Sequence, residues 1–146
     1  MRLVVQRVSS ARVLVDGKVV GEISRGAAAL LGVAATDGEK EIEWIANKLA
    51  NLRIFEDAEG KMNLSSVDVG GELLVVSNFT LYGDVQRGFR PSFTQAAAPE
   101  LAEPIYDKFV ERMRKTGLKI ETGVFGAMMR LEIIGDGPVT ILVESK

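Results

Sequence analysis

The sequence predicts a single α/β domain with a mixed or mostly antiparallel sheet and two main helices. A chain of 146 residues that is 47% hydrophobic fits one compact domain with a sizeable core. Short apolar runs typical of strands recur along it, and two longer stretches place apolar residues at helical spacing. No linker, repeat or low-complexity tract interrupts the pattern. We therefore expect residues 1–146 to form one domain.

The first third of the chain predicts strands. Residues 3–8 form an apolar-rich run, and residues 11–15 and 18–23 flank Asp16-Gly17, a strong signal for a two-residue hairpin. Residues 28–33 form a short apolar run that we expect to be a buried strand.

Two segments predict helices that lay an apolar face on the sheet. The first covers residues 39–53, and the second runs from about residue 99 to residue 116, with Gly117 as its stop. Pro104 means that the regular helix begins near it or that its first turn is kinked. The apolar positions at helical spacing are Ile42, Ile45, Ala46, Leu49 and Leu52 in the first segment, and Leu101, Ile105, Phe109 and Met113 in the second.

The remaining segments predict turns, loops and three further strands. Residues 72–76 place apolar side chains on both faces of the expected strand, which is typical of a central strand. The others are a turn at 57–60, an irregular stretch at 61–69, a long loop at 82–98, and two final strands at 128–134 and 139–143 around a Gly-Asp-Gly-Pro turn.

Composition narrows the chemistry. The chain has no His and no Cys, so disulfides, thiol nucleophiles and Cys-based zinc sites are excluded, as are the commonest metal ligand and the commonest general base. No tight Asp/Glu cluster indicates a carboxylate metal site, and we expect neither metal nor cofactor. The net charge of −2 means that a nucleic-acid partner needs a local basic patch.

We expect a cytoplasmic protein without a membrane span. The N-terminus is too short and too charged for a signal peptide. The longest weakly polar run, residues 26–35, is far below the roughly 20 residues that a membrane helix needs.

A polar cluster follows directly on the predicted strand 72–76. Ser77, Asn78 and Thr80 stand where the apolar run ends, and in open sheets such strand ends often carry the reacting groups. The functional interpretation is a pocket floor in which main-chain N–H groups and these side chains face a reacting carbonyl. The alternative is a strand that runs into a turn, with Asn and Ser as turn formers.

Gly137-Pro138 allows two interpretations. It is either a tight turn between the last two strands or a rigid main-chain wedge directed at a ligand.

The segment 87–93 mixes basic and aromatic residues in a predicted loop. Arg87, Phe89 and Arg90 suit the phosphates and bases of single-stranded RNA. The alternative is a solvated loop with its Phe residues tucked into the core.

Several stretches together resemble the D-aminoacyl-tRNA deacylase family. They are Gln6-Arg7-Val8, residues 53–63 (RIFEDAEGKMN), residues 74–77 (LVVS), residues 90–93 (RPSF), residues 106–110 (YDKFV) and residues 122–129 (TGVFGAMM). The resemblance covers essentially the whole chain. The family signatures Ser-Gln-x-Thr-Leu and Asn-x-Gly-Pro-Val-Thr appear here as Ser77-Asn78-Phe79-Thr80-Leu81 and Gly135-Asp136-Gly137-Pro138-Val139-Thr140, so Asn78 replaces Gln and Gly135 replaces Asn.

The resemblance implies a homodimer with the fold of that family. It also implies hydrolysis of the ester that links a D-amino acid, or glycine, to the 3′ end of tRNA. The cis Gly137-Pro138 pair would enter the partner's pocket and crowd out L-amino acids, while main-chain donors, water and the ribose 2′-hydroxyl carry the reaction. A specificity-shifted or non-catalytic homologue that binds tRNA or an amino acid remains the alternative.

The expected roles divide the site residues into three groups. They are catalysis for Ser77, Asn78 and Thr80, substrate binding for Phe79, Leu81, Phe89, Gly137, Pro138, Val139 and Thr140, and tRNA binding for Arg87 and Arg90.

Overall fold

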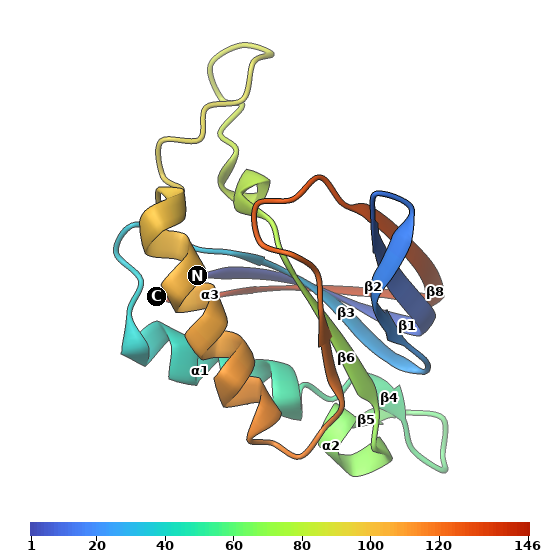
Figure 1. The fold of residues 1–146 in the computed structure, drawn as a ribbon. Helices are drawn as coiled ribbons and strands as arrows, with labels where there is room; N and C mark the ends of the chain where they lie inside the picture. The colour runs from blue at the N-terminus through green and yellow to red at the C-terminus, as the bar shows by residue number, and fades with distance from the viewer.

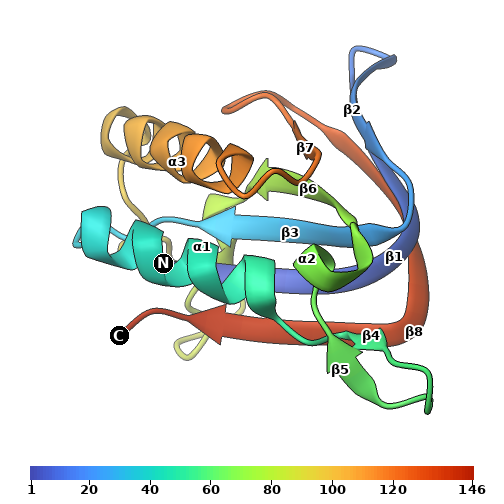
Figure 2. The same ribbon diagram turned by 90° about the horizontal axis from the view of Figure 1, so that it is seen from below.

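A computed structural model describes residues 1–146 as one curled sheet with two helices packed side by side on one face (Figures 1 and 2). The six sheet strands follow the order β2-β1-β3-β6-β7, and β8 pairs with the other edge of β1. The elements of this layer are β1 (Arg2–Val15), β2 (Lys18–Ile23), β3 (Gly26–Gly32), β6 (Glu72–Ser77), β7 (Ile120–Thr122), β8 (Arg130–Glu144), α1 (Glu39–Asn51) and α3 (Pro99–Arg114).

The sheet is mixed, which confirms the predicted α/β class. Strand β1 is antiparallel to β2, β3 and β8, whereas β6 is parallel to both β3 and β7. Strand β6 therefore lies between two neighbours, and Leu73 to Val76 are all buried, so it is the central strand that its apolar run predicts.

Both faces of the central strands are covered. Ala27, Ala29 and Leu31 of β3 belong to a cluster of 22 buried residues that includes the inner faces of α1 and α3. Ala28 points the other way, into a second cluster of seven buried residues that β1 and β2 help to enclose. The sheet curls far enough that a Cβ on Gly21 of β2 would lie 2.4 Å from the main-chain oxygen of Thr122 in β7.

Two predicted boundaries are wrong in the first half of the chain. β1 is one strand from Arg2 to Val15, because shifts of register near Val8 let it bend without breaking. The segment 61–69 is not irregular. It holds β5 (Met62–Leu64), which pairs with β4 (Phe55–Glu56), and α2 (Ser66–Val69), whose capping box joins Ser65 and Asp68.

The C-terminal strands also differ from expectation. Residues 130–144 form the single strand β8, and Gly135–Pro138 lie inside it as an irregularity and not as a turn between two strands. The short β7 was not predicted at all. Helix α3 continues through Pro104, which is exposed near its first turn and removes only one main-chain donor there. The buried face of α3 carries Ala102 and Tyr106, while Leu101 is 56% exposed, so that part of the predicted stripe is displaced by one residue.

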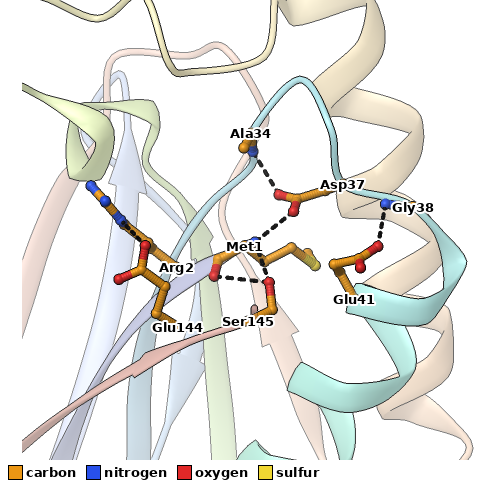
Figure 3. Close-up of polar contacts among 8 residues, drawn as sticks. All are labelled: Met1, Arg2, Ala34, Asp37, Gly38, Glu41, Glu144 and Ser145. Atoms are coloured by element: carbon orange, nitrogen blue, oxygen red, sulfur yellow. Dashed lines mark hydrogen bonds and ion pairs between the residues drawn. The ribbon is translucent and has the colours of Figure 1, made fainter.

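The N-terminus is fixed by a buried polar cluster (Figure 3). The Met1 amine donates to Asp37 Oδ1 and to Ser145 Oγ, both at 2.6 Å, and Asp37 Oδ2 accepts from the Ala34 N–H at 2.6 Å. These bonds join the start of β1 to the end of β8 and to the turn before α1, and they hold Arg2 beside the segment that follows β6. None of the helices combines the length and the apolar character that a membrane crossing would require.

Candidate functional site

The polar cluster lies at the carboxyl end of β6, where a 3₁₀ helix, η1 (Phe79–Tyr82), begins. Asn78 still belongs to the sheet through its main chain, because its N–H donates to Leu31 O of β3 at 2.8 Å. The chain then turns out of the sheet, which leaves Phe79 and Thr80 exposed and Ser77, Asn78 and Leu81 partly buried. The structure thus brings these five predicted residues together at one strand end.

Asn78 caps η1 with its side chain. Its Oδ1 accepts from the Thr80 N–H at 3.2 Å and also from the Thr80 hydroxyl. The first N–H groups of a helix have no acceptor within it, so a side-chain oxygen at this position stabilises the turn. The cap makes residues 78 and 80 a single hydrogen-bonded unit.

Three contacts press η1 against the sheet. A Cβ on Gly32 of β3 would lie 3.1 Å from Leu81 Cβ and 3.3 Å from Asn78 O, so any larger residue would push η1 away from the sheet by a few tenths of an ångström. Arg2 donates from Nη1 to Leu81 O at 3.2 Å, and its guanidinium lies 4.5 Å from the centre of the Tyr82 ring. Burial raises the pKa of Tyr82 to about 12, so this hydroxyl stays neutral. Sequence inspection missed Gly32 and Arg2, and no local pattern marks either.

The loop after η1 is tied to the site at its base and exposed at its tip (Figure 1). Phe93 meets the edge of the Phe79 ring with centroids 5.1 Å apart, and paired main-chain bonds between Asp84 and Ser92, at 2.8 and 2.9 Å, close the loop. Phe89 at its tip is fully exposed.

The prediction of a basic and aromatic loop is confirmed in position. Arg87 and Arg90 are exposed and form no ion pair within the chain. The alternative, with the Phe residues tucked into the core, does not describe Phe89.

Gly137-Pro138 forms a second, separate feature in β8. Its peptide bond is cis, both residues are exposed, and φ of Gly137 is +129°, a value that L side chains rarely adopt. Arg7, only 8% exposed, supports this stretch. Its Nε donates to Asp136 O at 3.1 Å and pairs with Asp136 Oδ2 at 3.2 Å, while Nη1 donates to Ile54 O at 2.8 Å.

The residues that follow the cis bond return to the ladder. Val139 packs on the larger core, and Thr140 Oγ1 accepts from the Gln6 side chain at 3.4 Å. Arg7 was not among the predicted site residues. A charged side chain inside the apolar pattern of a strand is the signal that could have identified it.

Within one chain the two features do not meet. Arg2 links the end of β8 to η1, because it bonds Glu144 at 2.8 Å as well as Leu81 O. Gly137 precedes Glu144 by seven residues, which is about 23 Å along a strand. Two hollows of about 320 and 230 Å³ are lined by other residues and not by Ser77 to Leu81. The larger lies between α3 and the segment 122–125, and the smaller at the N-terminal cluster.

Comparison with known proteins gives consistent matches over the whole length. The family model described as D-Tyr-tRNA(Tyr) deacylase matches residues 4–144. The D-aminoacyl-tRNA deacylase of Desulfatibacillum aliphaticivorans is 60% identical over 146 residues, all of both chains. That of Thermotoga petrophila is 57% identical over 145 residues, 99% of this chain and 97% of its own.

Two solved structures show the same fold. A "c-Myc DNA Unwinding Element Binding Protein" has a TM-score of 0.95 at 45% identity, with 100% of this chain and 99% of that chain covered. A probable eukaryotic D-amino acid tRNA deacylase has a TM-score of 0.84 at 20% identity over 97% of each chain, which supports the fold alone.

Proposed function

The chain belongs to the D-Tyr-tRNA(Tyr) deacylase family and is a D-aminoacyl-tRNA deacylase, a hydrolase; on that premise we propose how it selects and cleaves its substrate. The reaction hydrolyses the ester between a D-amino acid and the 3′ end of tRNA, and it also accepts glycine. The observation that carries this proposal is the polar cluster at the end of β6. It lies inside residues 4–144, the segment that matches the family. Its place is the cytoplasm, where charged tRNA is made and used, and its role is chiral proofreading of that tRNA before translation.

The chemistry relies on oriented donors. An aminoacyl ester is already activated, and the chain contains no His or Cys to serve as base or nucleophile. Negative charge develops on the acyl oxygen in the transition state, and one well-placed donor for it is worth roughly 3–4 kcal/mol. The main-chain N–H of Phe79 provides such a donor, because those of Asn78 and Thr80 already donate to Leu31 O and to Asn78 Oδ1. Ser77 lies beside it, while an ordered water and the ribose 2′-hydroxyl of the tRNA supply the attacking oxygen and its proton transfer.

Selectivity for D-amino acids arises between two subunits. Gly137 and Pro138 are exposed, fixed by Arg7 and too far from η1 to act on their own site. In a homodimer, Gly137 and Pro138 of one subunit can enter the pocket of the partner and act there. Main-chain atoms there, flanked by Val139 and Thr140, exclude the side chain of an L-amino acid, so specificity arises by rejection. Phe79 and Leu81 line the pocket that remains.

The loop beside the site holds the RNA. Phe89 offers a fully exposed ring for stacking on an unpaired base, and Arg87 and Arg90 are available to phosphates. Because Phe93 packs on Phe79 at the base of the loop, the loop keeps a fixed position relative to the site. Phe89→Ala should weaken tRNA binding several-fold and leave the released product unchanged. Equal affinity of the two proteins in a binding titration would argue against RNA binding by this loop.

The test is release of amino acid from D-Tyr-tRNA and L-Tyr-tRNA by the purified protein. Release from the D-form alone supports the proposal. Gly137→Ala should lose chiral discrimination, because its Cβ would lie 2.8 Å from Val139 N and 2.9 Å from Val139 Cγ2 and displace the pair. Gly71→Ala is the control, because it lies outside the site and its Cβ would meet only ordinary contacts, the nearest at 3.5 Å. Sedimentation of the same samples tests the dimer, and a monomer with full selectivity would contradict the cross-subunit arrangement.

A shifted specificity is the second candidate, motivated by Asn78 and Gly135, where the family has Gln and Asn. Parallel assays with Gly-tRNA and L-Ala-tRNA separate the two, since a shifted enzyme would prefer one of these over D-Tyr-tRNA. Binding of tRNA without any release would indicate a non-catalytic homologue.

A further inference from the structure

The α-amine of Met1 is a cation held almost entirely away from water (Figure 3). It donates to Asp37 Oδ1 and to Ser145 Oγ, both at 2.6 Å, and the side chains of Met1 and Asp37 are 0% and 5% exposed. The second oxygen of Asp37 accepts from the Ala34 N–H at 2.6 Å. The amine and the carboxylate therefore depend on each other for charge compensation.

The rest of Met1 fixes the amine in this place. Its side chain belongs to the cluster of 22 buried residues that joins the sheet to α1 and α3. Its carbonyl accepts from the Ser145 N–H at 3.0 Å, which ties the main chain to the end of β8. The amine cannot turn out to solvent unless this side chain also leaves the core.

An acyl group on this nitrogen would remove what its partners require. A protonated amine has three N–H donors and a positive charge, whereas a formylated or acetylated nitrogen has one N–H and no charge. One donor cannot serve Asp37 and Ser145 together, and the buried carboxylate loses its counter-charge. Met1 and Asp37 line the hollow of about 230 Å³, so the obstacle is charge and hydrogen bonding and not lack of space.

We propose that the fold requires a free, protonated α-amine at Met1, so that a formyl group left there by translation has to be hydrolysed off and N-acetylation blocks folding. In the hydrolysis, water attacks the formyl carbon, the carbon–nitrogen bond breaks, and the amine takes up the proton that formic acid gives up as it leaves as formate. Met1 itself has to be retained, because its loss would empty its place in the core. The inference does not depend on the proposed function.

Two samples of the full chain test the proposal, one with the formyl group retained and one with it removed. Reconstituted bacterial translation without and with a peptide deformylase supplies them, and intact mass identifies each. Urea titration followed by the fluorescence of Trp44, the single tryptophan, gives their stability. The formylated chain should have a folding equilibrium constant lowered about 100-fold or more. Equal midpoints for the two samples would overturn the proposal.

Two variants separate loss of charge from the bulk of the formyl group. Asp37→Ala removes the carboxylate that needs the cation, so formylation in this background should change the folding constant by less than about threefold. Ser145→Ala removes only the uncharged acceptor, so formylation there should still lower the constant about 30-fold or more. The same loss in all three backgrounds would assign the effect to bulk and refute the charge requirement.

Rescue supplies a second readout that does not rely on a variant. Treatment of the formylated chain with deformylase in urea, where the chain is open, followed by dilution, should restore the midpoint of the free-amine sample. Complete deformylation by mass without recovery of the midpoint would show that the formyl group was not the cause and would contradict the proposal.

Discussion

Gly32→Ala tests whether close packing against β3 positions the site. The new Cβ would lie 3.1 Å from Leu81 Cβ, 3.2 Å from Tyr82 Cδ2 and 3.3 Å from Asn78 O. Carbon atoms in good contact are about 3.5–4.0 Å apart. Two of the three neighbours are fixed to the main chain of the segment 78–81, so that segment must move as a unit by roughly 0.3–0.5 Å.

Both stability and activity should respond. Overpacking of this kind costs about 1–3 kcal/mol. Because a displacement of about 1 Å can cost a factor of 10², a shift of this size should slow hydrolysis about five- to tenfold. Urea titration gives the first value and single-turnover release from D-Tyr-tRNA the second.

Gly71→Ala is the control, since its Cβ would meet Gly26 Cα at 3.5 Å and Phe55 Cζ at 3.6 Å, which are ordinary contacts. If Gly32→Ala keeps the full rate and stability, the position of η1 does not depend on this approach and the reasoning is wrong.

Three further predictions concern charge and burial. The main-chain N–H of Ser65 donates to Asp68 and that of Ser24 donates to Glu72, and these bonds lower the pKa of both carboxyls. The two carboxylates stabilise the fold fully above their ordinary pKa near 4, and this stabilisation is lost as the pH falls through the lowered pKa values. Tm should therefore decline below about pH 4.5 and stay level from there to pH 6. Burial raises the pKa of Tyr82 to about 12, so the folded state binds this proton more tightly than the unfolded state; stability should fall between about pH 10 and 12, and ultraviolet titration should show no phenolate at pH 10. Asp37→Ala leaves the buried Met1 amine without its charged partner at 2.6 Å and with only the Ser145 hydroxyl. The change should cost about 3–5 kcal/mol in urea titration, whereas an unchanged midpoint would show that water replaces the carboxylate.

The sequence predicted the elements that have strong local patterns. The hairpin signal at Asp16-Gly17 and the helical spacing of Ile42 to Leu49 depend on neighbours in the chain, and both predictions are confirmed. It failed where the outcome depends on distant partners. Strand β7 is only three residues long and owes its existence to pairing with β6, and β8 stays continuous through Gly137 because β1 pairs with it on both sides of the irregularity.

The site shows the same division. The cluster from Ser77 to Leu81 is contiguous and could be identified from the sequence. Its supports could not, because Arg2 reaches Leu81 across 79 positions and Arg7 reaches Asp136 across 129. No local pattern encodes such contacts. A local pattern also does not reveal that the side-chain oxygen of Asn78 faces the Thr80 N–H, because this orientation depends on the turn that follows.

The edge position of β8 affects how readily the protein aggregates, both after purification and in the cell. One edge of this strand pairs with β1 and the other with nothing in the chain, while Ile134 and Leu142 are 62% and 78% exposed. A long uncovered strand edge is a template for further strands and so for aggregation. If subunit association covers it, the protein is most vulnerable when subunits are scarce. Dilution, which protects most proteins from aggregating, would then expose this one, and newly made chains would be the population that most needs chaperones.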